Sequence, residues 1–146
     1  MVKHEKSAGA IIFRIDNNKI FYLLLKYPTY WGFVKGAIEK EEEGNEKKTI
    51  IREAKEESGL KDLKFITGFE EKMGWFFRAE EGLVRKEAVY LLAETKNKQI
   101  KISEEHEDYK WCEFEEAQKL QRIKQNKKML EKADNFLKEH LKQRTL

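Results

Sequence analysis

The most constraining feature of this sequence is a well-bounded helix that stands between strand-like segments. Asn45 is a favourable N-cap, and Glu46 follows it in the first turn, where the helix dipole favours a negative charge. Gly59 and Leu60 supply the left-handed residue and the apolar contact that commonly end a helix. We therefore expect a helix over Glu46–Ser58, packed against a sheet that the flanking segments form.

The flanking segments have the apolar and β-branched residues typical of strands. Strands are expected over 8–15 and 20–27, joined by a turn at Asp16-Asn17-Asn18 because Asn and Asp tolerate left-handed backbone. Further strands are expected over 63–72, 85–95, 100–103 and 109–114, and helices over 115–122 and 126–142. This order predicts one domain over 1–146, of α/β (α+β) class, with a mixed sheet between helices.

Composition narrows the functional classes. With 40% hydrophobic residues in 146, the chain can enclose a core, and its net charge of +3 is too small to predict nucleic-acid binding, so no DNA partner is expected. Cys112 is the single cysteine, which favours a reducing compartment. We find no apolar run of the roughly 20 residues that a membrane helix needs, and no signal-peptide core. The sequence therefore predicts a cytoplasmic protein without a membrane partner.

Three glutamates of the expected helix share one face. Glu53, Glu56 and Glu57 are spaced i, i+3 and i+4, beside an apolar face that holds Ile50 and Ala54. Such like-charged pairs cost an isolated helix a few tenths of a kcal/mol each, about 0.2–0.5. A hard divalent cation reverses that sign, because Mg²⁺ and Mn²⁺ prefer carboxylate oxygen. The alternative interpretation is an ordinary solvated acidic face.

The residues around these glutamates match a longer pattern. The run from Arg52 to Leu60 reads R-E-A-K-E-E-S-G-L, which resembles the second half of the Nudix box, G-x5-E-x7-R-E-U-x-E-E-x-G-U. Gly36 would be the box glycine, although 15 residues separate it from Arg52 where the pattern has 13. A loop two residues longer explains the difference at little entropic cost. The upstream glutamate of the box then remains open among three neighbours, Glu41, Glu42 and Glu43.

The resemblance implies a fold, a cofactor and a reaction. It implies a Nudix-type α/β/α sandwich, with the box helix on one side of the mixed sheet and the C-terminal helix on the other. Glu53, Glu56 and Glu57, helped by the Gly36 carbonyl, would bind Mg²⁺ or Mn²⁺, and Arg52 would hold the carboxylates in place. Such a metal polarises phosphorus and lowers the pKa of a bound water. The implied reaction is metal-dependent hydrolysis of a nucleoside polyphosphate.

Matches outside the box are most similar to the asymmetrical diadenosine tetraphosphate hydrolases, which release ATP and AMP. Glu105-His106-Glu107-Asp108-Tyr109-Lys110-Trp111 resembles an E-H-x-x-Y-x-W stretch of that group. Glu105 would there be a further metal ligand or a general base. The resemblance implies substrate-binding roles for Lys35, Lys86, Trp75, Tyr30, His106 and Tyr109, with Lys86 on phosphate and Trp75 stacked on adenine.

Other interpretations remain open at this point. Trp75 is equally compatible with a hydrophobic plug, and Tyr109 is compatible with a place in the core. Related activities on the 5′ end of RNA or on (d)NTPs need the same kinds of residue, and the basic C-terminal segment would suit RNA. A catalytically inactive nucleotide-binding module is the alternative of another class, although the carboxylate set is intact. The chain would act as a monomer or a homodimer.

Overall fold

The computed structural model of the chain describes residues 2–144. The elements in chain order are β1 (Lys3–Asp16), β2 (Lys19–Lys26), β3 (Trp31–Gly32), β4 (Val34–Ala37), the 3-10 helix η1 (Lys40–Glu42), α1 (Glu46–Ser58), β5 (Lys64–Phe65), β6 (Glu71–Ala79), β7 (Gly82–Glu94), β8 (Asp108–Cys112), α2 (Phe114–Leu120) and α3 (Lys124–Arg144). Within residues 2–144, no helix combines the length and the apolar character needed to cross a bilayer.

One mixed sheet organises these elements. Its main path runs β3-β2-β1-β7-β5, while β4 pairs with β1, β6 with β7, and β8 with β2. The long strands β1 and β7 are parallel, with Ser7 opposite Ala88, and the other pairings are antiparallel. The parallel pair of β1 and β7 lies at the centre of the fold, although the two strands are far apart in the sequence. Both strands contain continuous apolar runs, which suit burial on two faces.

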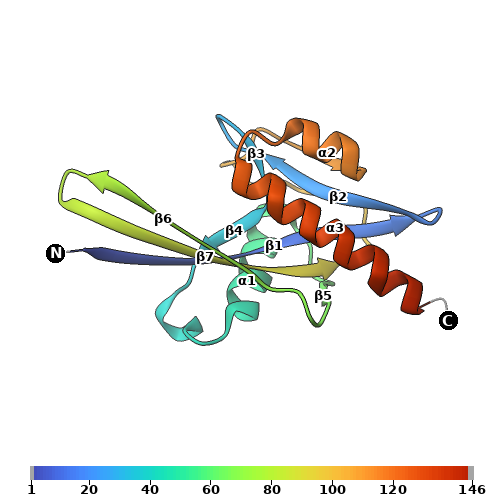
Figure 1. Ribbon diagram of the computed structural model, residues 1–146, viewed down its shortest axis with the longest axis horizontal. Coiled ribbons are helices and arrows are strands. Elements are labelled where there is room, and N and C mark those ends of the chain that lie inside the picture. Colours follow the sequence, from blue (N-terminus) through green and yellow to red (C-terminus); the bar gives the residue numbers. More distant parts are fainter. Residues whose placement is uncertain (1, 145–146) are drawn as a thin grey trace.

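Helices cover both faces of the sheet. Successive residues of β1 point to opposite faces, so Ala10 and Ile12 pack with Ile50 and Ala54 of α1, whereas Ile11 packs in the core under α2 and α3. The α3 stripe that enters this second core consists of Met129, Leu130, Ala133 and Leu137. Figure 1 shows α1 and α3 on different sides of the strands. The expected α/β/α sandwich is therefore confirmed.

Several expected boundaries were wrong. The strand expected over 63–72 is divided into the short β5 and the first two residues of β6, because the chain turns at Gly68, whose φ is +105°. No strand forms over 100–103, and β7 begins at Gly82, three residues before the expected start. The hairpin of β6 and β7 was not predicted. Beyond the helices both faces of this hairpin lie in solvent, so no buried face marks its strands.

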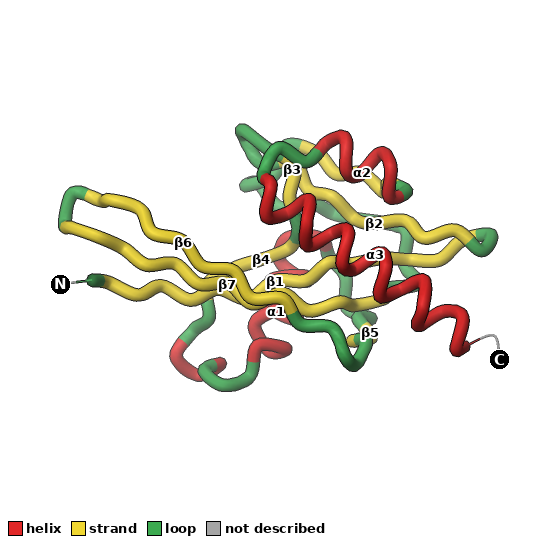
Figure 2. Tube along the Cα trace, viewed as in Figure 1, coloured by secondary structure: helices red, strands yellow, loops and turns green. Residues whose placement is uncertain are grey.

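This hairpin and the start of β1 form a three-stranded arm. Figure 1 and Figure 2 show the arm extending beyond α1 and α3, with the turn of the hairpin at its far end. We define the arm as Lys3–Ser7 of β1, 74–79 of β6 and 82–87 of β7. Its aromatic residues are exposed: 37% of Trp75, 57% of Phe76 and 38% of Phe77.

Candidate active site

Helix α1 has the bounds that its sequence predicts. The Asn45 side chain accepts a hydrogen bond from the backbone N–H of Lys48, and Gly59 ends the helix with a φ of +77°. Burial of Ile50 and Ala54 against β1 and β4 turns the opposite edge of the helix toward the loop that follows Gly36. The glutamates therefore face the region where the box pattern places its glycine.

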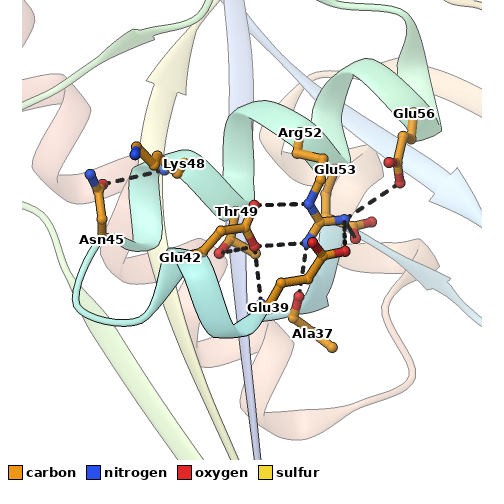
Figure 3. A network of polar contacts seen from close by, with 9 residues as sticks. All are labelled: Ala37, Glu39, Glu42, Asn45, Lys48, Thr49, Arg52, Glu53 and Glu56. Carbon is orange, nitrogen blue, oxygen red and sulfur yellow. Dashed lines mark hydrogen bonds and ion pairs between the residues drawn. The ribbon is translucent and has the colours of Figure 1, made fainter.

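Arg52 is the centre of a polar network that joins α1 to this loop (Figure 3). Its Nε and Nη2 atoms each donate to Glu42, at 2.9 Å, and Nη2 also donates to the Ala37 carbonyl at 2.9 Å. Its Nη1 lies 2.6 Å from Glu53 Oε1 and 3.6 Å from Glu56 Oε2. A planar guanidinium can satisfy several oxygens in a fixed geometry, so Arg52 sets the positions of both helix carboxylates.

Glu42 is the acidic residue of the loop that reaches this network. It is 6% exposed, and its Oε1 also accepts hydrogen bonds from Thr49 Oγ1 and from the backbone N–H of Glu39. Glu41 and Glu43 are exposed. Among the three open candidates the structure thus selects Glu42, six residues after Gly36 as in the box pattern, and places the two extra residues between Glu42 and Arg52.

The Glu42 contacts predict an acid-dependent contribution to stability. Hydrogen bonds from Arg52, before any other cause, lower the pKa of Glu42 to about 2, whereas an unfolded Glu has a pKa of about 4.3. The unfolded chain therefore takes up this proton at a higher pH, and the stabilisation present above about pH 4.3 is lost as the pH falls toward 2. The free energy of unfolding of Glu42→Gln should approach that of the wild type over this range. Urea unfolding at a series of pH values measures the difference.

Glu43→Gln is the matched control, since Glu43 is exposed and lies next to Glu42. Its unfolding free energy should follow the wild type at every pH. A gap between Glu42→Gln and wild type that stays constant from neutral pH to pH 2 would show that the ion pair with Arg52 does not stabilise the fold.

Glu53 lies directly against Gly36. A Cβ added to residue 36 would overlap the carboxyl group of Glu53, so only glycine leaves room for that carboxylate beside β4. Gly36 pairs with Ala8 of β1, which keeps this stretch of backbone extended. The predicted proximity of the box glycine and the first helix glutamate is therefore present in the fold.

Glu57 is the most perturbed carboxyl of the helix. It is 4% exposed and accepts hydrogen bonds from the backbone N–H of Lys35 and, at 3.4 Å, from the Tyr27 hydroxyl. Burial first, and then its hydrogen bond to Glu53 and the negative charge there, raise the pKa of Glu57 to about 10. The carboxyl groups of Glu53 and Glu57 therefore lie in contact, and together they offer the kind of oxygen ligands that a divalent cation prefers.

His106 lies behind Glu57 rather than in solvent. Its side chain is fully buried, its Nε2 is 3.5 Å from Glu57 Oε1, and its Nδ1 is 2.9 Å from Ser103 Oγ. Tyr27 packs edge-on against the imidazole, with ring centroids 4.5 Å apart. The sequence interpretation missed Tyr27, because a tyrosine at the end of a strand carries no functional signal by itself.

The remaining predicted ligands are less closely gathered. Glu56 is exposed, and it forms an ion pair with Arg52. Glu105 is exposed in the loop before His106, and its negative charge acts on that imidazole. Among residues 2–144, no three His, Cys, Asp or Glu side chains are already arranged around a common metal position. Glu53, Glu57 and Gly36 form the closely packed part of the predicted set.

The predicted substrate-binding residues lie in several parts of the fold. Tyr30 stacks on Tyr27 with ring centroids 4.7 Å apart, and Lys35 Nζ lies 5.8 Å from the centre of the Tyr30 ring. Burial lowers the pKa of Lys35, while the charge of Glu57 opposes that shift. Tyr109, in contrast, pairs with Leu25 and packs against the α1-side core, as the structural interpretation of this residue predicts.

Lys86 and Trp75 lie on the arm. They are opposite one another in the pairing of β6 and β7, so both side chains point to the face that α3 covers further along the sheet. Lys86 Nζ is 3.6 Å from Glu5 and 5.2 Å from the centre of the Phe77 ring. Its positive charge acts on Tyr30, which connects this part of the arm to the Tyr30–Lys35 pair. Trp75 is half-exposed, so it is not a plug of the core.

Known proteins resemble this chain over most of its length. The curated bis(5'-nucleosyl)-tetraphosphatase [asymmetrical] of Mus musculus is 34% identical over 90% of this chain and 95% of its own, and the one of Caenorhabditis elegans is 33% identical over 90% and 96%. A solved structure named C. elegans Ap4A hydrolase is 31% identical, covers 94% of this chain and 99% of its own, and has a TM-score of 0.74. Residues 3–133 match the NUDIX domain. With this match and the packing of Arg52 and Glu53 against the Gly36 loop, the chain belongs to the NUDIX family.

Proposed function

We propose that this protein hydrolyses diadenosine tetraphosphate asymmetrically, to ATP and AMP, with Mg²⁺ or Mn²⁺ as cofactor. The observation that carries the proposal is the placement of Glu53 and Glu57 beside Gly36, with Arg52 ordering the carboxylates from the other side. The choice of substrate is supported by the names of the similar proteins in mouse and C. elegans.

Glu53, Glu57 and the Gly36 carbonyl would hold the metal, and Glu56 and Glu105 would complete the set from the solvent side. When bound, the metal supplies charge neutralisation on phosphate oxygens and a water of lowered pKa. Arg52 keeps Glu53 and Glu56 on one side of the site, through contacts of 2.6 and 3.6 Å. Tyr27 and the backbone of Lys35 fix the buried carboxyl of Glu57.

The side chains for the substrate lie on one face of the sheet. Lys35 pairs with Gly9 of β1, and Lys86 pairs with Glu5, so both lysines point to the same face as Trp75. Strand β4 pairs only with β1 among the described residues, which leaves its outer edge next to Glu57. A polyphosphate that crosses this edge would meet the carboxylate-bound metal from one side and the two lysines from the other.

Product analysis on a substrate panel tests the proposal. The panel holds diadenosine polyphosphates, 5′-triphosphate RNA, and oxidised and normal dNTPs, each with Mg²⁺ or Mn²⁺. ATP and AMP in equal amounts from diadenosine tetraphosphate, at a higher kcat/KM than for any other member, is the expected result. Faster release of pyrophosphate from RNA or from a dNTP would overturn the substrate assignment. Absence of turnover on the whole panel would favour a nucleotide-binding module.

Trp75→Ala should raise the KM for diadenosine tetraphosphate more than it lowers kcat. Stacking of a base on an aromatic ring contributes about 1–3 kcal/mol, which corresponds to a KM increase of about 5- to 150-fold. Phe76→Ala is the matched control, because Phe76 is adjacent on β6, is also exposed, and points to the opposite face. Steady-state kinetics at low enzyme concentration measures both constants. Equal KM values for the two variants would remove Trp75 from the site.

A further inference from the structure

The four-residue turn from Ser103 to His106 holds a serine hydroxyl against the imidazole that lies behind Glu57. The backbone N–H of His106 donates to the Ser103 carbonyl at 3.1 Å, which closes the turn, and Ser103 Oγ lies 2.9 Å from His106 Nδ1. Glu104 and Glu105 are the exposed central residues of this turn. The contact between the serine and the imidazole is therefore set by the local backbone.

Two backbone hydrogen bonds fix this turn to the rest of the fold. Before the turn, the N–H of Lys101 donates at 2.9 Å to the carbonyl of Ser58, which follows Glu57 at the end of α1. After the turn, the N–H of Glu107 donates at 2.9 Å to the carbonyl of Lys26, the last residue of β2. The imidazole is therefore held behind Glu57 from both sides of the turn.

The second ring nitrogen of His106 faces a carboxyl oxygen. Among residues 2–144, Nε2 is buried and has no hydrogen-bond partner, and Glu57 Oε1 lies 3.5 Å from it. The Tyr27 hydroxyl, which is 3.4 Å from the same oxygen, has a single hydrogen, and its shorter contact of 2.7 Å is with the Phe33 carbonyl. Because buried polar atoms in proteins nearly always have a partner, a hydrogen on Nε2 suits this oxygen.

We propose that Ser103 is a positioning residue, whose hydroxyl donates to Nδ1 of His106 and so directs the imidazole hydrogen to Nε2, in a hydrogen bond to Glu57. This role rests on the proposed function, in which Glu57 is a metal ligand. In a neutral imidazole one nitrogen donates and the other accepts, and the hydrogen bond of one nitrogen sets the role of the other. The opposite tautomer would leave Nε2 bare against an oxygen that only accepts when the carboxyl is ionised.

A hydrogen bond of this kind keeps a metal-binding carboxylate in one orientation. Groups that hold the direct ligands of a metal commonly affect its binding by about 10–100-fold. Arg52 holds Glu53 and Glu56 in this manner, through contacts of 2.6 and 3.6 Å. Glu57 is not among the ion-pair partners of Arg52 in the described part of the chain. The serine and imidazole pair serves this third carboxylate.

Nitrogen NMR of isotope-labelled, metal-free protein tests the tautomer without turnover. The His106 ring of the wild type should carry its hydrogen on Nε2 and none on Nδ1. Variants His4→Gln and His140→Gln identify the signals of the other two histidines. Ser103→Ala should lose this preference, whereas Ser103→Thr, which keeps a hydroxyl, should retain it. A wild-type ring with a hydrogen on Nδ1, or unchanged ring signals in Ser103→Ala, would overturn the proposal.

Calorimetric titration with Mn²⁺ tests the consequence for the metal site. Ser103→Ala should raise the dissociation constant about tenfold, and Ser103→Thr should restore the wild-type value. Thr67→Ala is the matched control, because it removes an exposed hydroxyl between β5 and β6, and it should bind like the wild type. Circular dichroism checks that each variant is folded.

The same titration separates failure of this role from failure of the proposed function. Equal Mn²⁺ affinity in Ser103→Ala and the wild type would overturn the positioning role alone and leave the metal site in place. Absence of Mn²⁺ binding in the wild type would overturn the proposed function and the positioning role together.

Discussion

Glu57→Gln should lower kcat by about 10²–10³-fold, because an electrostatic contact of the reacting centre is lost. The same substitution should make the metal-free protein more resistant to heat. Burial and the neighbouring Glu53 raise the pKa of Glu57 to about 10. When the pKa of an acid is higher in the folded state than in the unfolded state, the free energy of unfolding falls as the pH rises above the unfolded pKa. The loss of stability reaches its full size only above the folded pKa. A neutral glutamine removes that cost at pH 7 and beyond. Steady-state kinetics and thermal unfolding without divalent metal measure the two effects.

Glu56→Gln separates the two effects, because Glu56 is exposed on the same helix. It should lower kcat, as a ligand of the solvent side, without raising the melting temperature. Glu43→Gln lies outside the site and should change neither quantity. Near-normal turnover in Glu57→Gln would refute its assignment as a metal ligand. A melting temperature that falls in that variant would contradict the cause given for the raised pKa.

Arg52→Lys should lower kcat by about 10–100-fold and should also lower the melting temperature, since residues that orient metal ligands have effects of this size. Lysine keeps the charge but has a single nitrogen, whereas Arg52 donates to Glu42 through two nitrogens and to the Ala37 carbonyl as well. The substitution therefore removes hydrogen-bond donors from the buried Glu42, and it no longer holds Glu53 in one orientation. Kinetics at several metal concentrations, together with thermal unfolding, measures both consequences.

Lys55→Gln is the matched control for Arg52→Lys, because Lys55 is an exposed cation on the same helix. Its kcat and melting temperature should match the wild type. If Arg52→Lys retained full activity at every metal concentration, Arg52 would not act by placing the carboxylates.

The sequence predicts α1 well because the signals for a helix are local. Its first cap, its glycine end and its apolar face lie within the segment itself, and the observed bounds equal the expected ones. The strand pair of β1 and β2 was also predicted, since Asn17 and Asn18 have φ values of +50° and +63° in the turn between them. Strand ends were less accurate, because tertiary pairing rather than residue type extends β1 from Lys3 to Asp16.

The arm could not be predicted from residue patterns. Strand formation at 71–79 depends on pairing with β7, and β7 is held in turn by parallel pairing with the distant β1. The aromatic run of β6 therefore indicated either a core plug or a stacking site until the pairing showed it exposed. The two-residue turn at the tip of the arm, Glu80-Glu81, has no turn-specific residue before Gly82, whose φ is +128°.

The candidate site was predicted in part for the same physical reason. Glu53, Glu57 and Arg52 follow from helical spacing and from the box pattern, and the fold brings them to Gly36. The choice of Glu42 over its neighbours needed the structure, because three consecutive glutamates in a loop differ only in where the 3-10 helix turns them. The buried positions of Tyr27 and His106 behind Glu57 likewise depend on the packing of β2 against the loop before β8.

Calorimetric titration with Mn²⁺ and Mg²⁺ tests the central claim most directly, that Glu53 and Glu57 together hold a divalent cation beside Gly36. The wild type and Glu43→Gln should show the same saturable binding, and the double variant Glu53→Gln/Glu57→Gln should lose it while remaining folded. Saturable binding of equal strength in the double variant would contradict the account, as would absence of binding in the wild type.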